Sequence, residues 1–101
     1  MRKANGKVKV KKIYYPAFVD KDAESDFGVS FPDFPGCITA GRTIEEAKAM
    51  ALEALRGHIE EMQAAGETIP SASSFDQVMN NPDFSDGVAF LVAVKEPSPT
   101  A

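Results

Sequence analysis

The sequence has little that would stabilise a small fold covalently or around a metal ion. It contains one cysteine, Cys37, one histidine, His58, and no tryptophan among 101 residues. A single thiol excludes an internal disulfide, and one cysteine with one histidine cannot supply the four ligands of a structural zinc site. A disulfide-stabilised secreted scaffold and a zinc module are therefore excluded. The sequence predicts a protein of a reducing compartment, the cytoplasm.

Long apolar runs are absent as well. No stretch approaches the ~18 consecutive apolar residues of a spanning helix, and no apolar segment follows the basic start as in a signal peptide. Hydrophobic residues make up 44% of the chain and charged residues 26%. This composition and length predict one soluble domain with a single modest core.

The charges are distributed unevenly along the chain. Six of the 11 basic residues lie in the first 12 positions, and from residue 13 onward 5 basic and 15 acidic residues leave a net charge of −10. An acidic body is repelled by nucleic acid phosphates and attracted to a basic protein. The basic arm, residues 1–12, predicts either a charged extension of the first strand or a tail that contacts phosphates. In the second case the contacting residues would be Lys7, Lys9, Lys11 and Lys12.

The first half of the chain predicts three short strands. Residues 13–19 are aromatic and β-branched, with Pro16 marking an edge or a bulge, and residues 27–31 alternate apolar with small or polar side chains. A polar turn joins them into a hairpin. After a rigid loop, residues 37–40 resume as a third strand that ends at Gly41.

A long helix over residues 44–65 follows. Thr43 and Glu46 have the spacing of a capping box, and Gly66 is a typical terminator. Gly57 inside the helix predicts the close approach of another backbone segment. The apolar stripe that would face the core contains Ile44, Ala47, Ala51, Leu55, Ile59 and Met62.

The remaining segments predict a short helix at residues 75–79 and a fourth strand at residues 87–94. Because this last strand is continuously apolar, it suits a position inside the sheet or one covered on both faces. The crossover rule then predicts that it returns parallel to the first strand. The fold class is therefore α+β, with a three-stranded antiparallel meander, a long helix, a short helix and a fourth, parallel strand.

Several segments together resemble the HicB antitoxin family. They are Tyr15–Ala17, Phe27–Thr39, Gly41–Ala47, Ala54–Leu55 and Gly66–Ser71. The resemblance implies a partial RNase H-like fold and divides the chain into a basic arm (1–12), a HicB-like domain (13–94) and a linker-like tail (95–101). Family members usually carry a C-terminal DNA-binding segment for repression of their own operon. We expect a chain truncated before that segment or an orphan relative without operator binding.

The resemblance also implies a function and partners. The protein would be the antitoxin of a type II toxin–antitoxin system and would bind and occlude HicA, a small basic mRNA-cleaving toxin. The acidic body agrees with such a partner. Because an open sheet leaves unpaired edges, we also expect a homo-oligomer, a dimer or a tetramer. The alternative function is a transcriptional regulator that binds nucleic acid through the basic arm or a missing C-terminal segment.

Catalysis is not expected from the sequence. Two-metal nuclease chemistry needs three or four converging carboxylates, but the first and last strands contain no acidic residue and only Glu46 and Glu53 on the helix remain. The other enzymatic alternative is a nucleophilic pair formed by Cys37 and His58. Both residues are better explained as packed or surface side chains. We therefore predict no metal, no cofactor and no enzymatic activity.

The best candidate for recognition is the rigid loop Pro32–Gly36. Prolines reduce the entropy lost on binding, and Phe34 either presents an aromatic anchor to a partner or folds back on the core. The acidic turn before the second strand is a further candidate. The predicted partner-binding residues are Asp22, Glu24, Asp26, Pro32, Asp33, Phe34 and Pro35.

Overall fold

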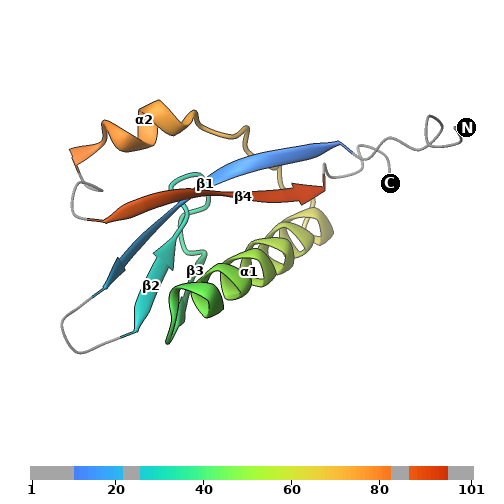
Figure 1. The fold of residues 1–101 in the computed structure, drawn as a ribbon. Helices are drawn as coiled ribbons and strands as arrows, with labels where there is room; N and C mark the ends of the chain where they lie inside the picture. The colour runs from blue at the N-terminus through green and yellow to red at the C-terminus, as the bar shows by residue number, and fades with distance from the viewer. Residues whose placement is uncertain (1–10, 22–25, 83–86, 96–101) are drawn as a thin grey trace, which may run out of the picture.

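Four antiparallel strands form one sheet in the order β3-β2-β1-β4. The computed structural model describes residues 11–21, 26–82 and 87–95. Along the chain its elements are β1 (Lys12–Lys21), β2 (Phe27–Ser30), β3 (Ile38–Gly41), α1 (Ile44–Ala64), α2 (Phe75–Met79) and β4 (Val88–Lys95) (Figure 1). All six elements predicted from the sequence are present, with small shifts at their ends.

The central strand β1 has different partners along its length. It pairs with β4 from Lys12 to Val19, but β2 pairs only with its second half, from Phe18 to Lys21. Pro16 therefore lies opposite Leu91 of β4, beyond the end of β2. The prediction that Pro16 marks an edge is correct for this local position, because a proline is tolerated where only one neighbouring strand is present.

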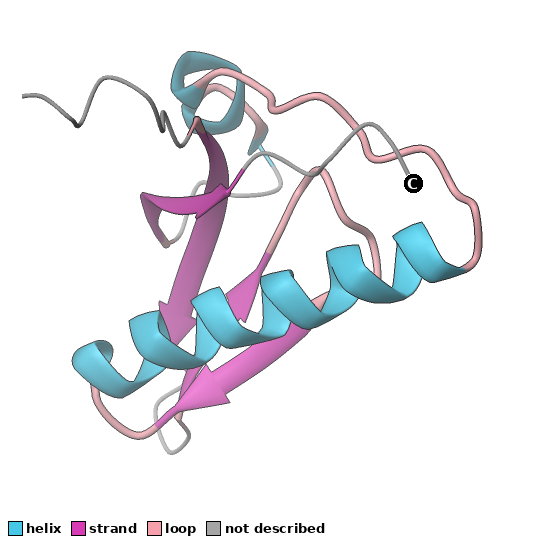
Figure 2. Cartoon of the chain, turned by 90° about the vertical axis from the view of Figure 1, so that its right-hand side faces the viewer, coloured by secondary structure: helices cyan, strands magenta, loops and turns pink. Residues whose placement is uncertain are grey.

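The predicted parallel return of the last strand is wrong, because β4 pairs antiparallel with β1. The helix α1 carries the chain back to the end of the sheet at which β1 begins, and a strand starting there would have been parallel. Instead, the segment after α1 arches over to α2 and crosses to the far end of the sheet (Figure 2). The chain thus crosses the sheet twice between β3 and β4, which reverses the direction of the last strand. The likeness to a partial RNase H fold stays a prediction.

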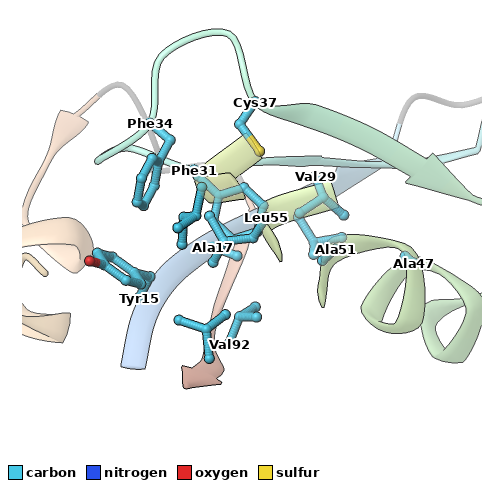
Figure 3. Close-up of a cluster of buried hydrophobic side chains, with 13 residues drawn as sticks. Tyr15, Ala17, Val29, Phe31, Phe34, Cys37, Ala47, Ala51, Leu55 and Val92 are labelled. Atoms are coloured by element: carbon cyan, nitrogen blue, oxygen red, sulfur yellow. The ribbon is translucent and has the colours of Figure 1, made fainter. Parts of the chain in front are cut away.

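The two helices lie on opposite sides of the β1–β4 pair (Figure 1). On the α1 side, alternate residues of β1, such as Ala17 and Val19, join a buried cluster with Leu55 of the helix. On the α2 side, Phe18 and Val78 are buried. The cluster on the α1 side contains Tyr15, Ala17, Val19, Val29, Phe31, Phe34, Cys37, Ala47, Ala51, Leu55, Ile59, Val92 and Val94 (Figure 3).

The fourth strand does not lie inside the sheet as predicted. It is an outer strand, and Val88 and Leu91 are 68% and 47% exposed, although Val92 and Val94 are buried against α1. A continuous apolar run indicates that a strand can be buried on both faces, but it does not determine which strands pair with it. The position of β4 in the sheet therefore could not be predicted from the residues of β4 alone.

Both ends of α1 are capped, although the return bond of the predicted capping box comes from Arg42 and not from the N-cap residue Thr43. The Thr43 hydroxyl accepts a hydrogen bond from the Glu46 N–H at 3.0 Å, and the Glu46 carboxylate accepts one from the Arg42 N–H at 2.6 Å. At the other end Gly66 has a φ of 77°, and the Glu67 N–H donates to the Met62 carbonyl at 2.8 Å. This is the Schellman arrangement that a glycine at this position favours.

Two glycines near α1 have opposite surroundings. A Cβ atom on Gly41 would lie 2.7 Å from the Ala47 Cα atom, so this glycine allows the start of α1 to approach β3 closely. A Cβ atom on Gly57 would meet nothing within 4 Å. The predicted close approach at Gly57 is therefore wrong, because the residue lies on the exposed flank of the helix rather than on its buried face.

Candidate protein-interaction surface

A shallow groove lies between the start of β3 and the middle of α1. We call it the α1–β3 groove. Its volume is about 290 Å³, and one wall comes from the edge of the sheet and the other from the helix. The residues that line it are Gly36, Cys37, Ile38, Glu53, Ala54, Gly57, His58 and Glu61.

The helical wall of the groove follows from the spacing of its residues. Glu53, Gly57 and Glu61 are four residues apart, so they lie one above another on the same flank of α1. Gly57 places no side chain between the two carboxylates, which leaves the groove open at its centre. From the opposite wall, Ile38 of β3 adds an apolar side chain that is 71% exposed.

The charged side chains of the groove are all negative in sign. Two carboxylates, Glu53 and Glu61, line it, and no lysine or arginine is among the lining residues. Carboxylates bind guanidinium and ammonium groups by short charge-assisted hydrogen bonds, and the exposed Ile38 offers contact to the aliphatic part of such side chains. The arrangement suits a lysine or arginine of a basic protein.

The loop at the rim of the groove exposes fewer of its side chains than the sequence predicts. Phe34 is only 2% exposed, and its ring makes an edge-to-face contact with Tyr15 at 4.8 Å between centroids (Figure 3). A second edge-to-face contact joins the Phe34 ring to His58 at 5.8 Å between centroids. Of the two alternatives for Phe34, the structure shows the core position, so the ring is not presented as an anchor. Pro35 and Gly36 are the exposed part of the loop, and Gly36 lines the groove.

Asp33 has partners inside the molecule. Its carboxylate accepts a hydrogen bond from the Ser73 N–H at 2.9 Å and another from the Ser73 hydroxyl. Close by, the Tyr15 hydroxyl donates to the Pro70 carbonyl at 2.7 Å. Burial, and secondarily the negative charge of Asp33, raises the pKa of Tyr15 above its ordinary value. Asp33 thus anchors the segment that leads to α2.

The remaining predicted site residues are only partly described. Asp26 is exposed just before β2 and Pro32 is half-buried, whereas Asp22 and Glu24 lie outside the described residues. In the basic arm Lys11 and Lys12 are exposed, and Lys7 and Lys9 lie outside the described residues. Partner or nucleic-acid binding by any of these residues stays a prediction.

Cys37 and His58 both line the groove but are not arranged as an activated pair. Cys37 is 4% exposed, and burial raises the pKa of its thiol, which disfavours the reactive thiolate. The His58 ring contacts Phe34. Among residues 11–21, 26–82 and 87–95, no three His, Cys, Asp or Glu side chains gather as a metal site, and no helix is long and apolar enough to cross a membrane.

Sequence reasoning missed the groove as a unit. Glu53 was considered as a possible metal ligand and Gly57 as a packing glycine, but they were not joined with Glu61 and β3 into one groove. A signal was nevertheless present, because a helical glycine with a glutamate four residues before and after it marks an open acidic strip on one flank.

The chain is similar to proteins of one family. A family model described as the HicB-like antitoxin of bacterial toxin–antitoxin systems matches residues 15–99. An uncharacterised 14.9 kDa protein of Haemophilus phage HP1 is 38% identical over 82 residues, which are 81% of this chain and 61% of that protein. The chain therefore spans less than two thirds of the length of this relative.

Two solved structures have the same fold. The antitoxin HicB of Burkholderia pseudomallei superposes with a TM-score of 0.75 and 34% identity, covering 81% of this chain and 63% of that one. A chain of a HicA3 and HicB3 toxin–antitoxin complex superposes with a TM-score of 0.69 and 31% identity, covering 79% of this chain and 95% of that one. Together with the family match, these likenesses show that the chain belongs to the HicB-like antitoxin family of bacterial toxin–antitoxin systems.

Proposed function

We propose that this protein is an antitoxin that binds a small basic HicA-type mRNA interferase and occludes the surface with which the toxin binds and cleaves RNA. The observation that carries the proposal is the match of residues 15–99 to the antitoxin family. The likeness to a chain of a HicA3 and HicB3 complex supports a toxin as the partner. Neutralisation by occlusion needs no catalytic group in the antitoxin, and we propose a non-enzymatic role in the cytoplasm.

The charge distribution supports a basic partner. From residue 13 onward the net charge is −10, and a field of this sign speeds and orients the encounter with a cationic protein. We propose that the α1–β3 groove, together with the exposed Pro35 at its rim, forms part of the contact. Glu53 and Glu61 would each accept hydrogen bonds from a lysine or arginine of the toxin.

The second candidate function is nucleic-acid binding. It is favoured by one observation, the six basic residues within the first 12 positions. Lys7, Lys9, Lys11 and Lys12 would contact phosphates, alone or together with a C-terminal DNA-binding segment beyond this sequence. Such binding would weaken steeply as salt concentration rises and would be lost when residues 1–12 are removed.

Co-expression with the small basic protein encoded beside this chain tests the antitoxin proposal. We expect the two proteins to purify together and the toxicity of the neighbour to be relieved. Binding would be measured by isothermal titration calorimetry with a catalytically inactive toxin. No complex and no rescue, with a folded chain and a toxic neighbour, would contradict the proposal and favour the nucleic-acid alternative.

A pair of charge-matched variants tests the groove. E53K/E61K reverses both lining carboxylates, and E45K/E60K makes the same charge change at exposed positions of α1 outside the groove. We expect the first variant to weaken toxin binding by about a hundredfold or more and the second by much less, because close charge pairs contribute more than the general field. Equal losses would show that the net charge, and not the groove, determines affinity.

A further inference from the structure

The segment that joins the two helices is held at only a few points. We call residues 67–73 the crossing segment; it runs from the end of α1 to Ser74, the N-cap of α2 (Figure 2). In the described chain, no backbone–backbone hydrogen bond involves residues 68–73. Ile69 packs against the buried cluster, and two further points are held by hydrogen bonds to side chains. Such a segment opens more easily than the helices and strands around it.

Both hydrogen-bonded anchors of the crossing segment lead to the loop at the rim of the α1–β3 groove. The Ser73 N–H donates to the Asp33 carboxylate at 2.9 Å, and Asp33 belongs to that loop. The Tyr15 hydroxyl donates to the Pro70 carbonyl at 2.7 Å. The Tyr15 ring in turn packs edge-to-face on Phe34 of the same loop at 4.8 Å between centroids (Figure 3). The crossing segment therefore holds two neighbouring residues of the loop, one directly and one through Tyr15.

The rim loop, Pro32–Gly36, passes these contacts on to the groove. Phe34 is shared by two successive turns, because its N–H donates to the Phe31 carbonyl and its carbonyl accepts from the Cys37 N–H, both at 3.0 Å. Cys37 lines the groove. The Phe34 ring also contacts His58, a lining residue from the helical wall, at 5.8 Å between centroids. The position of Phe34 therefore affects both walls of the groove.

The rim loop has little freedom to absorb a displacement. Pro32 and Pro35 each fix a φ angle, one before and one after Asp33. Phe34 is 2% exposed, so its ring cannot shift without disturbing the side chains packed around it. A displacement of Asp33 is thus carried along the chain to Cys37.

We propose that the crossing segment is a latch for the α1–β3 groove. While Ser73 and Pro70 are docked, the rim loop keeps the shape that covers Cys37 and completes the groove. When the crossing segment is released, the loop loosens and the groove binds its partner less tightly. By reciprocity, a partner in the groove favours the docked segment. Only the effect on binding rests on the proposed function, and the effect on the shape of the groove does not.

The thiol of Cys37 reports the state of the rim without any partner. It is 4% exposed, so in the folded protein it reacts with an aromatic disulfide reagent only when the rim opens. S73A removes the hydroxyl bond to Asp33 from the side of the crossing segment and should raise the reaction rate at pH 8 by about fivefold to tenfold. S71A removes an exposed hydroxyl of the same segment and is the matched control, with the rate of the parent.

A second control separates the latch from a general loss of stability. T43A removes the hydroxyl that caps the start of α1, at the other end of the helix from the crossing segment, and costs comparable stability. It should leave the Cys37 rate near that of the parent. In S73A the rate should depend little on urea below the unfolding transition, because a local opening exposes less surface than global unfolding. If T43A accelerates the reaction as much as S73A, the inference is wrong.

A double-mutant cycle assigns the effect to the bond between Asp33 and Ser73. D33A removes both acceptors and should accelerate the Cys37 reaction at least as much as S73A. D33A/S73A should react at the rate of D33A alone, because the second substitution has no hydroxyl bond left to remove. Rate increases that multiply would show that the two residues act on Cys37 independently and would overturn the inference.

Calorimetry with a catalytically inactive toxin tests the effect on binding. We expect S73A to bind about fivefold more weakly than the parent and S71A to bind as the parent does, because the opened rim must close before the groove is complete. A parent that binds no toxin would contradict the proposed function, whereas the thiol rates would still decide whether the latch controls the groove. Equal toxin affinities of S73A and S71A, or equal Cys37 rates, would overturn the inference.

Discussion

Asp33 and Ser73 are joined by two hydrogen bonds although they are 40 residues apart in the sequence. The Ser73 N–H donates to one carboxylate oxygen of Asp33 at 2.9 Å and the Ser73 hydroxyl to the other at 2.5 Å. One partner lies in the loop after β2, and the other in the segment that crosses the sheet toward α2. This pair ties the segment that crosses the sheet to the loop after β2.

The first prediction concerns this pair. D33A removes both acceptors and leaves the partly buried Ser73 N–H without its partner, so we expect a loss of about 1–3 kcal/mol in the free energy of unfolding. S73A removes only the hydroxyl bond and should cost less. D26A, which removes an exposed carboxylate, is the control, and urea unfolding measures all three. A D33A variant as stable as D26A would show that the two bonds contribute nothing.

The second prediction concerns alkaline pH. The pKa of Tyr15 in the folded state is raised above its ordinary value of 10.0, so the unfolded state loses this proton first. The stabilisation that the protonated Tyr15 gives the folded state is complete below about pH 10. It declines as the pH rises through the pKa of Tyr15 in the folded state. We expect Y15F to be less stable at pH 8 but to lose less stability between pH 9 and 11.5.

The control for Tyr15 is Y14F, which removes the neighbouring exposed phenol. Because burial also raises the pKa of Cys37, all variants are compared in a C37A background by urea unfolding at each pH. If the free energy of unfolding fell equally for the parent and for Y15F between pH 9 and 11.5, the raised pKa of Tyr15 would be contradicted.

The elements of this fold were predictable from the sequence because their signals are local. The N-cap at Thr43, the glycine at position 66 and the apolar stripe between them define α1 without any knowledge of its neighbours. The direction of β4 was not predictable in this way. It depends on how far the segment after α1 travels across the sheet, and the bonds that fix this path, such as Tyr15 to Pro70, join residues distant in the sequence.

The candidate site was predicted only in part. A proline-rich loop beside a strand indicated a rigid surface, and Pro35 is exposed there. The sequence could not show that Phe34 points inward, because the rings that surround it, Tyr15 and His58, belong to β1 and α1. The groove likewise exists only when the edge of β3 is placed beside α1, so helix periodicity alone could not reveal it.

The third prediction concerns the reactivity of Cys37. The thiol is 4% exposed, and burial raises its pKa, so both access and thiolate formation are disfavoured in the folded protein. We expect the reaction with an aromatic disulfide reagent at pH 8 to be at least about a hundredfold slower than in 8 M urea. An A40C variant in a C37A background, with its cysteine at an exposed position of β3, is the control and should react rapidly when folded. A folded-state rate for Cys37 equal to that of the control would contradict the burial of the thiol.

The fourth prediction compares two glycines with opposite surroundings, Gly41 at the end of β3 and Gly57 inside α1. In G41A the new Cβ atom would lie 2.7 Å from Ala47 Cα and 2.8 Å from the Glu46 carbonyl carbon, so either β3 or the start of α1 must move. We expect a loss of about 1–3 kcal/mol in the free energy of unfolding. In G57A the Cβ atom meets nothing within 4 Å, and alanine is the better helix former, so the free energy of unfolding should rise by about 0.5–1 kcal/mol. Urea unfolding of both variants beside the parent measures the difference, and a destabilising G57A would show that a neighbouring segment packs on that flank of α1 after all.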